Sequence, residues 1–117
     1  MANSGLTGPH TLSKTTVDAV VTKKSPGAYA LGHTRTTDQA YIIQYVGRSD
    51  EDLNARIKQW DGVYAQFKYG YFPSPKAAFD KECQLFHDFT PPDNKVHPAR
   101  PQGSNWKCPV SGCTALN

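Results

Sequence analysis

The sequence lacks any apolar run long enough to cross a bilayer, and its N-terminus lacks the basic and then apolar layout of a signal peptide. We therefore expect a cytoplasmic protein with no membrane partner. Cysteine is scarce, with three in 117 residues, and a reducing cytoplasm disfavours a disulfide between Cys108 and Cys113. The net charge is only +3, which permits binding to a phosphate backbone but is equally explained by an ordinary, slightly basic surface. A length of 117 residues suits one domain.

Two neighbouring runs of mostly apolar residues, each with tyrosine, lie at positions 27–32 and 41–47, and the second is rich in β-branched residues. They predict two strands, and the polar segment 33–39 between them predicts a hairpin connection. Positions 49–52 then supply a hydroxyl and three carboxylates, which favour a helix N-terminus. We expect this helix to begin at about Asp50.

The second half of the chain predicts one more strand and one more helix. In the first helix, apolar residues follow a helical spacing at Leu53, Ile57, Trp60 and Tyr64. Positions 66–72 have the aromatic content of a third strand, and Ser74 followed by Pro75 is typical of a helix start. The predicted fold is an α/β domain of the α+β type, with a small three-stranded antiparallel sheet flanked by helices.

Glu82 is an anomaly on the last predicted helix. It lies in the middle of an otherwise apolar face formed by Ala78, Phe79, Cys83, Phe86 and Phe89. A carboxylate is costly to bury unless a cation, a metal or a hydrogen-bond donor meets it. Two interpretations stay open: a core glutamate with a partner such as Arg56, or a ligand of a divalent metal facing a cleft.

A short set of motifs carries a family resemblance. G-A-Y at 27–29 and Y-V-G at 45–47, followed by Arg56 and later by Glu82, resemble the GIY-YIG nuclease superfamily over roughly residues 27–89. The resemblance implies a GIY-YIG-like fold and a divalent-metal-dependent endonuclease that hydrolyses phosphodiester bonds in DNA. It also implies that Arg56 and a Mg²⁺ or Mn²⁺ ion on Glu82 hold the phosphodiester. Tyr45, or Tyr29 beside it, would be the general base for a water.

Four further residues are expected to contact the substrate. Gly47 closes the second motif, and Arg48 next to it could bind a substrate phosphate or face water. Lys68 lies among aromatic residues that can stack on unpaired bases. The family pattern includes an asparagine after the glutamate helix, and we prefer Asn94 to Asn105 because it is nearer.

Two positions near the motif allow other interpretations. Arg56 could instead be a surface arginine paired with Asp52 one helical turn earlier. Many members of the family carry a histidine or tyrosine four residues after the motif arginine, whereas this chain has Trp60 there. Tryptophan can neither act as a base nor accept a hydrogen bond, so Trp60 is expected only to pack.

The two ends of the chain differ in composition from the middle. We expect a flexible N-terminal arm over residues 1–25, whose apolar cluster at 17–21 could add a short strand or helix, and a GIY-YIG-like nuclease domain over 26–90. Residues 91–117 form a proline-rich C-terminal wrap. A structural zinc ion could anchor this wrap. The candidate zinc ligands are Cys83, His87, Cys108 and Cys113, with His97 as a substitute, although Cys83 could be only a small buried residue.

Two other functions fit parts of the pattern. One is a nucleic-acid-binding module that cuts nothing, and the other is a protein-interaction domain stabilised by zinc. Retention of Tyr29, Tyr45, Arg56 and Glu82 together favours the nuclease over both. A domain with one phosphodiester site needs a second protomer, or a second binding event, to cut both strands of a duplex.

Overall fold

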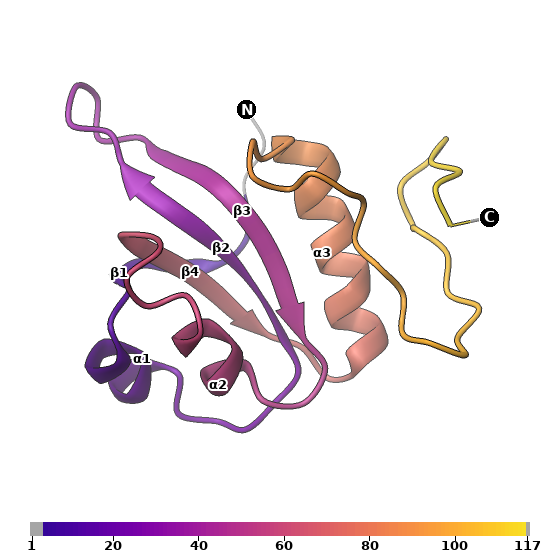
Figure 1. Ribbon diagram of the computed structural model, residues 1–117, viewed down its shortest axis with the longest axis horizontal. Helices are drawn as coiled ribbons and strands as arrows, with labels where there is room; N and C mark the ends of the chain where they lie inside the picture. Colours follow the sequence, from indigo (N-terminus) through magenta and orange to yellow (C-terminus); the bar gives the residue numbers. More distant parts are fainter. Residues whose placement is uncertain (1–3, 117) are drawn as a thin grey trace.

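The computed structural model describes residues 4–116 and is an α+β fold (Figure 1). Its antiparallel sheet has the strand order β1-β4-β2-β3. Helices α1 and α2 cover one face of the sheet, and α3 covers the other. In chain order the elements are β1 (Thr7–Thr11), α1 (Lys14–Val20), β2 (Gly27–Thr34), β3 (Tyr41–Ser49), α2 (Leu53–Lys58), β4 (Gln66–Tyr71) and α3 (Pro75–Phe89).

The prediction of three strands is wrong by one, because β1 adds a fourth strand at the edge of the sheet. β1 pairs antiparallel with β4, with Thr7 opposite Tyr69 and His10 opposite Phe67. The sequence of β1, T-G-P-H-T, is mostly exposed and lacks the apolar alternation that marks a half-buried strand. Backbone pairing with β4 places β1 in the sheet, and the side chains of β1 do not predict this pairing.

The N-terminal segment is part of the folded domain. We expected a flexible arm over residues 1–25; instead this range contributes β1 and α1, and its first three residues lie outside the described part of the chain. The expected apolar cluster does form a helix, which Ser13 caps through its side chain. Leu12, Val17 and Val21 are buried in the same core as α2, and this burial explains why the segment packs on the sheet.

Helix α2 differs from its prediction at both ends. It begins at Leu53, because the Asp52 side chain accepts a hydrogen bond from the Ala55 N–H and caps the helix. It ends at Lys58, so Trp60 lies beyond the helix and yet packs against the same core as Leu53 and Ile57. The helical spacing identified core residues correctly but overestimated the length of the helix.

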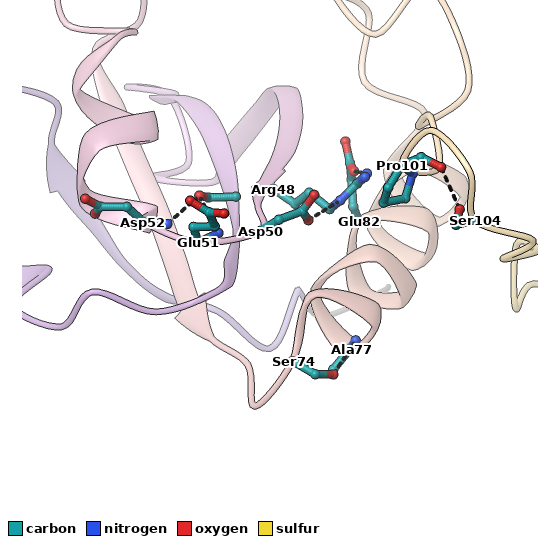
Figure 2. A network of polar contacts seen from close by, with 10 residues as sticks. Arg48, Asp50, Glu51, Asp52, Ser74, Ala77, Glu82, Pro101 and Ser104 are labelled. Atoms are coloured by element: carbon teal, nitrogen blue, oxygen red, sulfur yellow. Dashed lines mark hydrogen bonds and ion pairs between the residues drawn. The ribbon is translucent and has the colours of Figure 1, made fainter.

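Helix α3 agrees with its prediction. Ser74 caps it by accepting a hydrogen bond from the Ala77 N–H at 3.1 Å (Figure 2), and Pro75 occupies the first turn. The expected polar connection joins β2 to β3, whose pairing is interrupted by a register shift between Leu31 and Gly32. On the side of the shift away from the β2–β3 connection, Tyr29 of β2 lies opposite Gly47 of β3.

Residues 91–116 form no helix or strand and run back alongside α3 (Figure 1). The Trp106 ring lies 5.4 Å from the ring of Phe79, measured between centroids, and Pro91 and Pro98 are buried. We call residues 91–116 the C-terminal strap. None of the three helices of residues 4–116 is long and apolar enough to span a membrane.

Candidate active site

One cleft of about 610 Å³ brings together the four residues predicted to be catalytic. Tyr29 comes from β2, Tyr45 from β3, Arg56 from α2 and Glu82 from α3. The cleft is completed by Gly47, Arg48, Ser49, Asp50, Glu51, Asp52, Ala55, Gln59, Trp60 and Ala99. Residues far apart in the sequence therefore line one cleft.

Gly47 makes room for the ring of Tyr29. A Cβ atom at position 47 would lie 2.5 Å from both Cζ and the hydroxyl oxygen of Tyr29. Tyr29 is only 2% exposed, so its packed ring would have to shift to admit a methyl group at position 47. Gly47 was predicted to bind substrate, but its contacts give it a packing function that places the two tyrosine motifs face to face.

Trp60 contacts both tyrosines of the cleft. Its indole N–H donates a hydrogen bond to the Tyr29 hydroxyl at 3.0 Å, and its ring lies 4.8 Å from the ring of Tyr45, measured between centroids. Burial raises the pKa of Tyr29, and the hydrogen bond from Trp60 opposes that rise. We expected Trp60 only to pack, because tryptophan cannot act as a base or accept a hydrogen bond. The sequence does not show which acceptor its N–H would meet.

The hydroxyl of Tyr45 lacks a hydrogen-bond partner among residues 4–116, and its ring is half-buried at the cleft. Burial raises the pKa of Tyr45, the negative charge of Glu82 raises it further, and the positive charge of Arg56 lowers it. The charges of Glu82 and Arg56 thus act on the same phenol in opposite directions.

Glu82 is 7% exposed, and Arg48 is its partner. Its Oε1 atom accepts a hydrogen bond from Nη1 of Arg48 at 2.7 Å, while Nε of Arg48 donates to Asp50 at 2.9 Å (Figure 2). The Arg48 guanidinium also lies over the ring of Phe79, 5.1 Å from its centroid. Burial raises the pKa of Glu82, and the Arg48 hydrogen bond opposes this. The ion pair suggested with Arg56 is therefore not formed; Arg48, expected to contact substrate or water, neutralises Glu82 instead.

The side chain of Arg56 is exposed and makes no hydrogen bond or ion pair within the described chain. The alternative pairing with Asp52 does not occur, because the Asp52 carboxylate caps α2. Arg56 lies close enough to the other cleft residues to influence the pKa values of Tyr29, Tyr45 and Glu82. It is thus a cation at the cleft whose donors are available to a ligand.

Asn94 holds the C-terminal strap against the edge of the sheet. Its Oδ1 atom accepts a hydrogen bond from the N–H of Val46 at 2.8 Å, and its Nδ2 atom donates to the Val46 carbonyl at 3.0 Å. Asn94 also lines a second cavity, of about 390 Å³, that shares Tyr45 and Glu82 with the main cleft. Its amide serves the backbone of β3, whereas we expected it to bind substrate.

Lys68 lies away from the cleft, although we expected it to contact substrate. Its ammonium is 5.0 Å from the centroid of the Tyr41 ring, and the residue does not line the main cleft or the cavity beside it. The aromatic content of β4 suggested a base-stacking surface. Its first aromatic residue, Phe67, is instead fully buried in the core, and Tyr69 and Tyr71 pack against that core.

Two histidines and two cysteines gather beside α3, where they could hold a metal ion such as zinc. The ligand atoms of His87, His97, Cys108 and Cys113 all lie within 4.8 Å of one another. The predicted set contained Cys83 in place of His97. Cys83 is fully buried on α3, and burial raises the pKa of its thiol. His97, named as a substitute, occupies the fourth position.

The close approach of Gly47 and Tyr29 predicts that Gly47→Ala destabilises the fold. The added methyl group would overlap the buried phenol ring, and overpacking of this kind costs about 1–3 kcal/mol. Gly70→Ala is the matched control, because its Cβ would meet the end of the flexible Leu6 side chain at 3.1 Å and the Phe72 ring at an ordinary contact distance of 3.6 Å. Urea unfolding should show the larger loss for Gly47→Ala. Equal losses for the two variants would contradict the packing function of Gly47.

Comparisons of the chain with protein-family models, with curated proteins and with solved structures find no match. The GIY-YIG resemblance accordingly stays a prediction from the motifs. The cleft presents two tyrosines, a buried glutamate and an arginine whose side chain has no hydrogen-bond or ion-pair partner within residues 4–116.

Proposed function

We propose that the chain is a divalent-metal-dependent endonuclease that hydrolyses phosphodiester bonds in DNA at this cleft. The observation that carries the proposal is the placement of the unpaired Arg56 guanidinium in one cleft with Glu82, Tyr29 and Tyr45. A cation, a carboxylate and a titratable hydroxyl are the groups that metal-assisted hydrolysis of a phosphodiester needs.

Arg56 supplies the phosphate-binding group. Its fixed fork of N–H donors matches two oxygens of a phosphate, and no protein carboxylate in the described chain occupies that fork. Arg48, in contrast, is committed to Glu82 and Asp50. Arg56 therefore binds the scissile phosphate and stabilises the negative charge that develops on it in the transition state.

Glu82 fits a divalent cation. Arg48 bonds only its Oε1 atom, and Oε2 has no donor within residues 4–116 although the residue lines the cleft. Mg²⁺ and Mn²⁺ are commonly held by one or two carboxylates together with substrate phosphate and water. A bound ion would supply Lewis-acid polarisation of a phosphoryl oxygen. Arg48 keeps the carboxylate charged and oriented in its buried position.

Tyr45 is the better candidate for the general base. Its hydroxyl is free of protein partners in the described chain, whereas the hydroxyl of Tyr29 is buried and accepts the Trp60 hydrogen bond. The ring contact with Trp60 holds the Tyr45 phenol in place. As water attacks the phosphorus, its proton passes to the Tyr45 oxygen and the P–O bond to the leaving group breaks. The positive charge of Arg56 favours the phenolate that accepts this proton.

The proposal is tested by cleavage of labelled single-stranded and duplex DNA with Mg²⁺ or Mn²⁺. We expect Arg56→Ala to lower kcat/KM by roughly 10²- to 10³-fold, because it removes a donor that acts on the transition-state charge. Arg35→Ala is the matched control and should leave kcat/KM unchanged, since Arg35 pairs with Asp38 away from the cleft.

Two outcomes would contradict the proposal. One is equal activity of the Arg56 and Arg35 variants. The other is the absence of cleavage by the wild-type chain with every divalent ion and both forms of DNA. Binding without cleavage would instead support a non-catalytic nucleic-acid-binding module. Circular dichroism of each variant would show that it is folded.

The tyrosine base predicts a specific pH dependence. Because burial raises the pKa of Tyr45 above its ordinary value, the phenol form dominates at neutral pH. At pH values below that pKa, each unit by which the pH is raised should increase the reactive phenolate about tenfold, and kcat/KM should rise with it. Tyr45→Phe should lose activity together with this rise, whereas Tyr64→Phe, whose hydroxyl bonds Asp93 outside the main cleft, should retain both. A rise that survives in Tyr45→Phe and vanishes in Tyr29→Phe would assign the base to Tyr29.

A further inference from the structure

We propose that His87, His97, Cys108 and Cys113 bind one structural zinc ion, which clamps the C-terminal strap to α3 and so fixes the wall of the cleft. The four ligand atoms come from α3 and from three separate points of the strap, and all lie within 4.8 Å of one another. The inference does not depend on nuclease activity, because zinc can be measured without any substrate.

The distances within the cluster suit a tetrahedral ion. Sγ of Cys108 lies 3.4 Å from Nε2 of His87, and Sγ of Cys113 lies 3.4 Å from Nε2 of His97. Zinc bonds of about 2.0–2.3 Å at tetrahedral angles separate neighbouring ligand atoms by roughly 3.3–3.8 Å. The two pairs are thus spaced as ligands of a common ion.

A second contact prepares His97 as a ligand. Its Nδ1 atom lies 2.9 Å from the carbonyl oxygen of Pro98. A carbonyl only accepts, so Nδ1 carries the proton and the lone pair of neutral imidazole is on Nε2, the atom directed at Cys113. Metal-bound histidines usually donate their other ring N–H in this way, which fixes the tautomer and the ring orientation.

The ligand types favour zinc and a closed, structural site. Two thiolates and two imidazoles are a typical structural zinc set, and softer sulfur ligands disfavour Mg²⁺. Four protein ligands fill the tetrahedron, so no position is left for a catalytic water. Zinc here therefore differs in kind from the divalent ion proposed at Glu82.

The clamp would hold the later part of the strap, where Trp106 packs on Phe79. The strap contains no helix or strand among its described residues, and Arg100 bonds carbonyls of Trp106 and Leu116 within the strap itself. Its start is hydrogen-bonded to the domain, where Asn94 bonds the Val46 backbone, the Asp93 N–H donates to the Gln44 carbonyl and the Tyr64 hydroxyl donates to the Asp93 carboxylate. A segment without its own core commonly obtains its folding energy from a bound metal.

The clamp also bears on the cleft. His97 lines the cavity that shares Tyr45 and Glu82 with the main cleft, and Ala99 lines both. His97 lies between Asn94 and Ala99 in the sequence. A bond from His97 to zinc would therefore fix the segment that closes this side of the site. Removing zinc should free the strap and open the wall, while the sheet and α3 stay folded.

The first test measures zinc in the purified chain by plasma mass spectrometry after equilibration with zinc and desalting. We expect about one zinc per chain for the wild type and for Cys83→Ala, which removes a thiol that contacts Cys108 but lies outside the four-ligand cluster. Cys108→Ser and Cys113→Ser should each lose most of the metal. Zinc-free wild type, or equal loss in Cys83→Ala and Cys108→Ser, would overturn the ligand set.

Two measurements on the wild-type chain keep the test decisive if a variant does not fold. Co²⁺ substitution should give the intense visible bands and thiolate charge transfer of a tetrahedral site with sulfur ligands; an octahedral spectrum would contradict the site. Chelation should also accelerate tryptic cleavage at Lys95 and Lys107, which are exposed on the strap, at least tenfold more than cleavage at Lys58 in α2. Unchanged strap cleavage after zinc removal would overturn the clamp.

Discussion

The ion pair between Glu82 and Arg48 is the interaction on which the arrangement of the cleft depends. Helix α3 packs its apolar face on the sheet, and this packing buries the Glu82 carboxylate. Arg48 meets it from the end of β3, and removal of either partner would leave an uncompensated buried charge. The pair fixes α3 relative to β3, so that Glu82 and Tyr45 line one cleft. It also leaves Arg56, rather than Arg48, free for a ligand.

Much of this arrangement could be predicted because its signals are local. The serine and proline at the start of α3 satisfy the helix N-terminus within four residues, and the helical spacing places Glu82 among apolar residues. The two tyrosine motifs lie on strands joined by a short connection, so their adjacency follows from a hairpin. Helical spacing thus singled out Glu82, whereas the motif resemblance supplied Tyr29, Tyr45 and Arg56.

What could not be predicted depends on contacts between distant segments. Strand β1 carries no apolar alternation, and only its pairing with β4 reveals it. The choice of Arg48 over Arg56 as partner of Glu82 depends on where β3 ends against α3. His97 joins the metal cluster because the strap turns back along α3 (Figure 1). The sequence had suggested Cys83 instead, because it lies one helical turn before His87. Local patterns show which groups need a partner, and the tertiary fold decides which partner each one meets.

The two proposed metal sites differ in function: the open one at Glu82 would bind a divalent ion for catalysis, and the closed one beside α3 would bind a structural zinc ion. The proposed hydrolysis depends on the open site. The most direct measurement is a crystal structure of the Tyr45→Phe chain with DNA and Mn²⁺, with the metal located by its anomalous scattering. The account predicts Mn²⁺ on the Glu82 carboxylate and a DNA phosphate in contact with Arg56. Mn²⁺ and phosphate bound elsewhere, with Glu82 contacting only Arg48, would contradict it.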